Sequence, residues 1–151
     1  MKDTDIAYFA GIIDGEGCVY VNVRKVGGKG RRKTPGFGVK LTISITDECL
    51  VNWFKEKCEL TSIYYREKPG GNRKPKWQCT WNNSKAEKYL KLVLPHLVIK
   101  TQQAILGIEL LEHLRNSPIG GDCKQVSEED VAYRLSIKQK ISKLNKRGTN
   151  V

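Results

Sequence analysis

A period-two alternation of apolar and polar residues, present in two neighbouring segments, constrains the fold of this chain more than any other feature. Residues 18–26 alternate valines with polar side chains, and residues 37–46 alternate aliphatic residues with Lys, Thr and Ser. Such alternation is typical of β-strands that bury one face. The basic, glycine-rich segment GGKGRRKTPG, residues 27–36, lies between them. We therefore predict a β-hairpin with a long basic loop.

The same pattern occurs a second time, because residues 61–68 and 75–82 predict another hairpin, joined by PGGNRK. Amphipathic segments predict helices from Thr4-Asp5 to about Asp14, from Thr46 to about Glu59, from a Ser84–Glu87 capping box to near Pro95, at 101–116, and at 127–146 from Ser127. The order α-β-β-α-β-β-α with two trailing helices is an α+β fold with one antiparallel sheet. The 151 residues predict a single domain, with its core in 4–116 and a basic C-terminal helix at 127–146.

The charge of the chain is strongly positive and unevenly distributed. Lys and Arg number 27 against 16 Asp and Glu, a formal charge of +11. No acidic residue occurs from 17 to 46, Glu67 is the one acid within 66–76, and none follows Asp130. Such segregation indicates a polyanionic partner, most often nucleic acid. The alternative is a solvated basic surface, which normally interleaves both signs.

One face of the predicted sheet carries side chains that suit contact with DNA. Arg, Lys, Asn and Gln read base edges in the major groove, and Lys and Arg neutralise phosphates. A strand of about ten residues spans roughly 33 Å, which matches about ten base pairs. We predict DNA contacts at exposed strand positions and in the hairpin loops, at Tyr20, Asn22, Arg24, Arg31, Arg32, Lys33, Lys40, Thr42, Ser44, Arg66, Lys68, Arg73, Lys76, Gln78 and Thr80.

The cysteines and the hydropathy of the chain bear on where it works. Five cysteines without a CxxC pair predict reduced, buried thiols instead of disulfides or a zinc site. No apolar run approaches the roughly 20 residues that cross a membrane. The acidic, periodic N-terminus does not resemble a signal peptide. We therefore expect no membrane partner and no secretion, with the protein in the cytoplasm or nucleoid, or in an organelle matrix if it is encoded there.

The segment YFAGIIDGEGCVYV, residues 8–21, places acids where the first helix meets the first strand. Ala7, Gly11 and Gly15 lie four residues apart and form a flat ridge, which predicts either close pairing with another helix or packing against the sheet. If two copies pair through this ridge, their Glu16 side chains converge at two helix C-termini. Such an arrangement favours a divalent cation, and oxygen ligands suit Mg²⁺, with Mn²⁺ or Ca²⁺ as substitutes. Beside a basic sheet, it predicts a metal-dependent phosphodiesterase.

These residues resemble a known family. FAGIIDGEG, residues 9–17, is similar to the LAGLIDADG motif of homing endonucleases, and LPHLVIKTQQA, residues 94–104, resembles the basic segment before the fourth helix of that family. The resemblance covers residues 4 to about 115. It implies an intron-encoded, Mg²⁺-dependent enzyme that cuts both strands of DNA. A single copy of the motif implies a homodimer that reads a long, pseudo-palindromic site, about 20 base pairs by the strand length above.

The resemblance also assigns roles to individual residues. Glu16 matches the metal-binding acid, and Gly15 would supply a metal-binding carbonyl. Asp14 matches a structural acid. Lys100 matches the active-site lysine, although a surface lysine at a helix start is the alternative. Asp47 departs from the family, where a neutral polar residue orders water; it would order water, hold an outer-shell metal water, or only place charge at a helix start.

Two other functions are compatible with the sequence. A splicing maturase on the same fold would bind intron RNA, and a regulator would bind DNA without cutting it. The presence of Glu16 and Lys100 favours the nuclease, because neither alternative needs a cation between two subunits.

Overall fold

The predicted order of helices and strands is confirmed. A computed structural model of the protein describes residues 1–24, 34–67, 75–117 and 126–146. The elements are α1 (Asp3–Glu16), β1 (Gly17–Arg24), β2 (Gly36–Ile45), α2 (Glu48–Lys57), β3 (Ser62–Arg66), β4 (Lys76–Asn82), α3 (Ser84–Val93), the short 3-10 helix η1 (Leu94–His96), α4 (Thr101–Asn116) and α5 (Glu128–Leu144).

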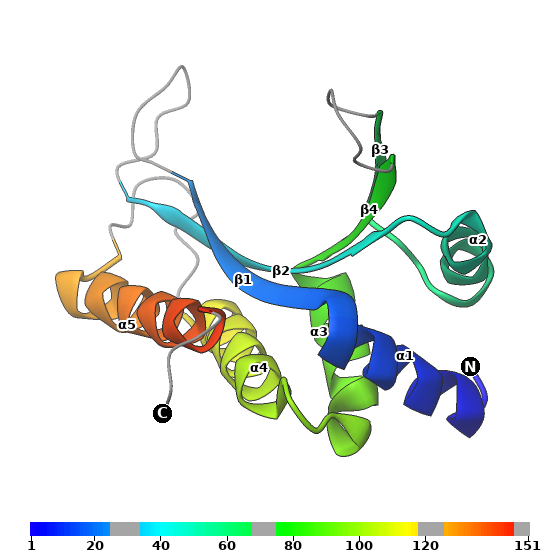
Figure 1. The fold of residues 1–151 in the computed structure, drawn as a ribbon. Helices are drawn as coiled ribbons and strands as arrows, with labels where there is room; N and C mark the ends of the chain where they lie inside the picture. Colours follow the sequence, from blue (N-terminus) through cyan, green and yellow to red (C-terminus); the bar gives the residue numbers. More distant parts are fainter. Residues whose placement is uncertain (25–33, 68–74, 118–125, 147–151) are drawn as a thin grey trace.

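The strands form one antiparallel sheet in the order β1-β2-β4-β3. Figure 1 shows α3, α4 and α5 beneath this sheet, while its upper face curves upward at both sides and is left open. Since side chains of a strand alternate between the two faces, the sheet has one face for the core and one for a partner. We call the open side the concave face.

The core lies between the sheet and the helices, as the alternation predicts. Val19, Leu41 and Trp81 are fully buried on the helical side. Gly107 permits α4 to approach the sheet closely, because a Cβ there would lie 3.2 Å from Val19 and 3.3 Å from Val39. A larger residue at this position would force α4 and the two strands apart.

Two predictions about where helices begin are corrected by the structure. Helix α1 begins earlier than expected: Lys2 is its N-cap residue, and the Lys2 backbone N–H donates to the Asp5 carboxylate at 3.1 Å. The Ser84–Glu87 capping box is wrong, because Ser84 is already helical and the N-cap residue is Asn83. The Glu87 carboxylate instead binds Arg115 and Lys91. By contrast, the predicted cap at Ser127 is confirmed by a hydrogen bond from the Asp130 N–H.

Asn83 has a specific function at the end of β4. Its backbone N–H donates to the Val39 carbonyl at 2.8 Å, and its side-chain oxygen accepts from the Val39 N–H at 3.2 Å. The φ angle of Asn83 is 46°, a positive value that Asn adopts more often than most residues. Gly38 leaves room for this side chain, because a Cβ there would lie 2.6 Å from Asn83 Oδ1.

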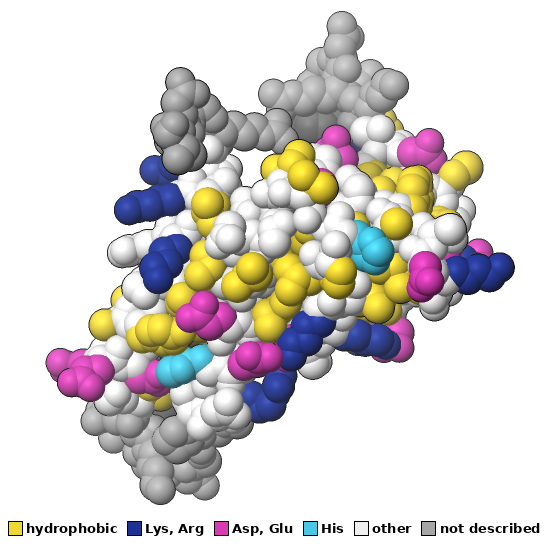
Figure 2. Space-filling view, turned by 90° about the horizontal axis from the view of Figure 1, so that it is seen from below, with side chains coloured by type: hydrophobic (Ala, Val, Ile, Leu, Met, Phe, Trp, Pro, Cys, Tyr) yellow, Lys and Arg dark blue, Asp and Glu magenta, His cyan; other side chains and the backbone are white. Residues whose placement is uncertain are grey.

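The helical side of the molecule interleaves acidic and basic side chains, as Figure 2 shows. Glu87 is buried among them and pairs with Arg115 and Lys91. Burial alone would raise the pKa of Glu87, but hydrogen bonds from Arg115 and Lys91 lower it overall. Another pair, His113 with Asp130, links α4 to α5. Several charges of the helical side are therefore paired with each other.

Cys18, Cys49, Cys58 and Cys79 are free thiols, while Cys123 lies outside the described residues. Burial raises the pKa of Cys58 to about 12 and that of Cys79 to about 11. Cys49 is exposed. Because the thiolate is the reactive form, we expect an alkylating reagent near pH 8 to modify Cys49 long before Cys58 or Cys79. Peptide mass mapping over time measures this order, and denaturant should abolish it; equal rates in the folded protein would contradict the burial.

Candidate active site and nucleic-acid interface

The end of α1 lies in an open pocket of about 340 Å³ that collects residues from distant parts of the chain. Its lining residues are Asp14, Gly15, Glu16, Gly17, Cys18, Ile99, Lys100, Gln103, Leu144, Asn145 and Lys146. The structure thus brings together Glu16, Gly15 and Lys100, three of the predicted site residues.

Asp14 holds this arrangement in place. Its carboxylate accepts hydrogen bonds from three successive backbone N–H groups, those of Val98 at 2.8 Å, Ile99 at 3.2 Å and Lys100 at 2.9 Å. These contacts join residues 84 to 86 positions apart in sequence. Asp14 therefore makes the contacts of a structural acid, and it brings the start of α4 against the end of α1.

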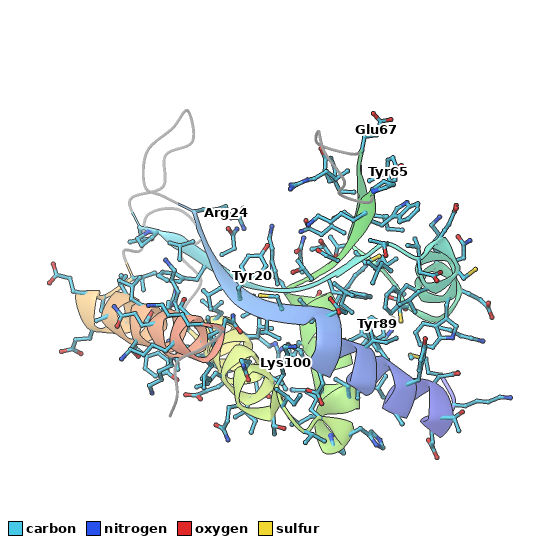
Figure 3. All side chains as sticks on the ribbon, viewed as in Figure 1. Tyr20, Arg24, Tyr65, Glu67, Tyr89 and Lys100 are labelled. Atoms are coloured by element: carbon cyan, nitrogen blue, oxygen red, sulfur yellow. The ribbon has the colours of Figure 1, made fainter. Side chains whose placement is uncertain are left out.

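Lys100 binds the end of α1 from the other side. Its Nζ donates to the Ile13 carbonyl at 2.8 Å and to the Asp14 carbonyl at 2.5 Å. The Ile13 carbonyl also accepts the Gly17 N–H. The Asp14 carbonyl lies in the last helical turn, where carbonyls lack helical partners and carry partial negative charge, so an ammonium group is favourable there. Lys100 is half-buried, and Figure 3 shows it below the sheet beside α4. Lys100 is therefore not an exposed surface lysine, which was the alternative for this residue.

Asp14→Ala should lower the free energy of unfolding by about 1–3 kcal/mol, because it removes the acceptor of three N–H groups. Urea denaturation at fixed protein concentration measures this change. Asp3→Ala is the matched control, since Asp3 is exposed in the first turn of α1 and has no partner among the described side chains. Equal losses for the two variants would mean that the contacts of Asp14 do not stabilise the fold.

The donors at the end of α1 suit a hard divalent cation. Across the described part of the chain, the exposed Glu16 carboxylate makes no hydrogen bond or ion pair. The Gly15 carbonyl belongs to the last helical turn, where carbonyls lack helical partners. Carboxylate and carbonyl oxygens are the ligands that Mg²⁺ and Ca²⁺ prefer. However, no group of three His, Cys, Asp or Glu side chains that could hold a metal occurs among the described residues.

Asp47 lies elsewhere, at the start of α2. Its Oδ1 accepts from the N–H of Cys49 at 2.8 Å and of Leu50 at 3.3 Å, which makes Asp47 the N-cap residue instead of Thr46. Asp47 does not line the pocket that contains Glu16. Of the three roles considered for it, a helix-start charge is the one that these contacts support.

The small-residue ridge of α1 is exposed. Ala7, Gly11 and Gly15 face away from the core, and a Cβ at Gly11 or Gly15 would meet nothing within 4 Å. Packing of this ridge against the sheet is therefore excluded. Val98 and Ile99, which follow η1, are also exposed, to 85% and 70%. The ridge and these two residues leave an apolar surface next to Glu16.

On the concave face, most predicted DNA-contact residues lie where their parity places them. Tyr20, Asn22, Lys40, Ser44 and Gln78 are half-exposed, while Arg24, Arg66 and Lys76 are exposed. Figure 3 shows Arg24 at the far end of β1. Neighbours across the strands form rows, which are Asn22–Gly38, Tyr20–Lys40–Asn82, Cys18–Thr42–Thr80–Ser62, Ser44–Gln78–Tyr64 and Lys76–Arg66.

Two of the predicted contact residues are not exposed. Thr42 and Thr80 have the correct parity but are only 8% and 7% exposed. They lie opposite each other in the middle row, in the part of the sheet that curves. The prediction that these two side chains are accessible is therefore wrong. Alternation predicts on which face of the sheet a side chain lies, but it does not predict how exposed that side chain is.

The predicted contacts omit several residues of this face, including Ser62, which is exposed opposite Thr80. Tyr64 is 61% exposed and shares the parity of Arg66, and Asn82 shares that of Gln78. Asn82 contributes to a polar hollow of about 280 Å³, lined by Asn22, Arg24, Gly38, Lys40, Asn82 and Asn83. Period-two alternation, extended to the ends of both strands, would have found them. The predicted contacts Arg31, Arg32, Lys33, Lys68 and Arg73 lie outside the described residues.

In the part of the chain that the structure covers, no helix has the length and apolar character needed to cross a membrane. No protein-family model matches the sequence, and no curated protein matches it. Solved structures do match. The homing endonuclease I-CvuI in complex with a DNA target is 18% identical, covers 98% of this chain and 86% of its own, and has a TM-score of 0.69.

Two further structures agree with this match. The archaeal intron-encoded homing endonuclease I-Vdi141I, complexed with DNA, is 15% identical over 99% of this chain and 89% of its own, with a TM-score of 0.73. The LAGLIDADG meganuclease I-AabMI, bound to uncleaved DNA, is 17% identical over 94% of this chain but 46% of its own, with a TM-score of 0.63. With the motif at the end of α1 and the open sheet beside it, these matches establish that the chain has the fold of the LAGLIDADG homing endonucleases.

Proposed function

We propose that this protein is a site-specific, divalent-metal-dependent DNA endonuclease that cuts both strands as a homodimer. One observation carries the proposal: Glu16 is an exposed, unpaired acid in the described structure, and it lines one pocket with Lys100 at the end of α1, the helix that carries the exposed ridge. An acid at this junction suits chemistry on a phosphate and contributes little to the stability of one chain.

The exposed ridge supports the homodimer. Ala7, Gly11 and Gly15 leave the backbone of α1 open to close approach by a second copy, and Val98 and Ile99 add apolar surface beside it. A twofold axis along the ridge would bring two Glu16 side chains together. The second Glu16 would then supply another carboxylate ligand for the cation.

Glu16 and the Gly15 carbonyl would hold the cation, with the second Glu16 from the other copy. A bound divalent cation stabilises charge on the attacking and leaving oxygens of a phosphodiester. Lys100 fixes the end of α1 and concentrates positive charge at the pocket. Asp14 holds the start of α4 against the end of α1, so that Glu16 and Lys100 line the same pocket, where a scissile phosphate would lie. The neighbours with this fold include structures with DNA in the presence of Mg or Ca, which supports the choice of metal.

The concave face would lie along the DNA. Its outer rows offer Arg, Lys, Asn and Gln side chains to base edges and phosphates, and its buried threonines form a floor. With two copies, the paired faces span about 20 base pairs at roughly 33 Å per strand.

The test is a selection from randomised duplex DNA, run with Mg²⁺ and with a chelator, in which cut and bound molecules are both sequenced. We expect cut molecules to share one long, roughly palindromic site, and to occur only with Mg²⁺. A bound but uncut consensus would refute the nuclease in favour of a DNA-binding regulator. No preference for any DNA would favour binding of intron RNA.

A further inference from the structure

The pocket at the end of α1 contains a buried amide that has no role in the function proposed above. Gln103, in the first turn of α4, lines this pocket together with Glu16 and Lys100. Gln103 is only 6% exposed, and its Oε1 has no hydrogen-bond partner among the described residues. Buried acceptors without a partner are rare in folded proteins, so this one needs a physical reason.

The packing of α4 does not supply that reason. Gln103 is the third residue of α4, a position from which glutamine often accepts the backbone N–H of the N-cap residue. Here the N-cap residue is Lys100, and its N–H donates to Asp14 Oδ1 at 2.9 Å instead. The Nε2 of Gln103 donates to the Leu144 carbonyl over 3.4 Å, which is long for such a hydrogen bond. The fold therefore satisfies this amide poorly.

The pocket offers the amide a better environment. Its wall on the side of Leu144 is fixed to the sheet, because Asn145 Nδ2 donates to the Val19 carbonyl at 2.8 Å. Figure 1 shows this end of α5 beneath β1. The pocket is open and measures about 340 Å³. A water molecule occupies about 30 Å³ in the liquid, so several water molecules fit beside Gln103.

A neutral amide oxygen suits the chemistry of this pocket. It accepts hydrogen bonds but does not titrate, so it can orient water between the Glu16 carboxylate and the Lys100 ammonium without exchanging a proton with either. Turning the Gln103 side chain into the pocket gives Oε1 such a partner and gives up only the long bond to Leu144. Holding a nucleophile in the direction of attack lowers the barrier of a reaction.

We propose that Gln103 belongs to the active site: when DNA binds, its side chain turns into the pocket, and Oε1 accepts a hydrogen bond from the water that attacks the phosphate. Gln103 orients this water and takes no proton from it. The inference rests on the proposed function, because it adds a residue to the same reaction.

The experiment compares Gln103→Met with Gln102→Met. Methionine is close to glutamine in length and volume but lacks the amide, and Gln102 is an exposed neighbour that does not line the pocket. Urea unfolding is measured without metal, duplex binding with Ca²⁺ and with a chelator, and single-turnover cleavage with Mg²⁺. We expect Gln103→Met to unfold at the same or a higher urea concentration, because an unpaired acceptor is removed. It should bind duplex as the wild-type protein does and cleave about tenfold to a hundredfold more slowly. Gln102→Met should match the wild-type protein in all three measurements.

The outcomes separate this inference from the proposed function. Equal cleavage by the two variants would overturn it, and so would a joint loss of stability and cleavage in Gln103→Met, which is the result expected of a residue that only supports the fold. If Ca²⁺ raises the duplex affinity of the wild-type protein but not of Gln103→Met, Gln103 holds the cation and the water role is wrong. If the wild-type protein cuts no duplex, the proposed function itself is refuted, and this inference with it. Gln103→Leu is a second apolar variant if the methionine protein does not fold.

Discussion

Glu16→Gln should reduce cleavage by at least about a thousandfold, which corresponds to roughly 4 kcal/mol of lost transition-state stabilisation. The substitution keeps the size of the side chain but removes the negative charge that holds a divalent cation. DNA binding should be preserved or strengthened, since each subunit loses one negative charge beside the phosphates. Single-turnover cleavage with Mg²⁺ and equilibrium binding of the same duplex measure the two effects.

Glu129→Gln is the matched control for this result. Glu129 is an exposed acid in the first turn of α5 and does not line the pocket, so its removal should leave cleavage unchanged. Full cleavage by the Glu16→Gln protein would overturn the assignment of Glu16 to the metal. Loss of both cleavage and DNA binding would instead show that Glu16 supports the structure of the DNA-binding face.

Gly11→Glu should convert the proposed homodimer to monomers and abolish the proposed double-strand cleavage, because two charged side chains would meet where the α1 backbones approach. Gly11→Ala separates stability from assembly. In one chain the new Cβ meets nothing within 4 Å, and replacing a helical Gly by Ala stabilises a helix by roughly 0.5–1 kcal/mol. In a close-packed dimer the same methyl group should weaken association by about tenfold or more. Sedimentation equilibrium measures association, and thermal unfolding at low concentration measures the stability of the chain.

Ala132→Glu controls for a new acid on an exposed helix face, since Ala132 is exposed on α5. It should leave assembly and cleavage unchanged. If the Gly11→Glu protein assembles as the wild-type protein does, the ridge of α1 is not the dimer interface.

The local features of this fold follow from short sequence patterns. Alternation with a period of two placed Val19 and Leu41 in the core and Lys40 on the open face, because the backbone of a strand fixes which side each residue faces. The predicted cap at Ser127 is also correct, because an N-cap depends only on contacts with residues about three positions away. The Ser84 cap failed because a long-range partner, Val39, fixes the side chain of Asn83.

The assembly of the candidate site depends on tertiary structure. The motif identified Glu16, but only the fold shows that Asp14 and Lys100 join the end of α1 to the start of α4. Only the fold places Lys146 in the same pocket, through the contact of Asn145 with β1. The sequence by itself determined the order of the elements and the face of each strand residue, because these depend on backbone geometry over a few residues. The tertiary structure decided which side chains share the pocket and which, like Thr42, are covered, because these depend on how distant elements pack.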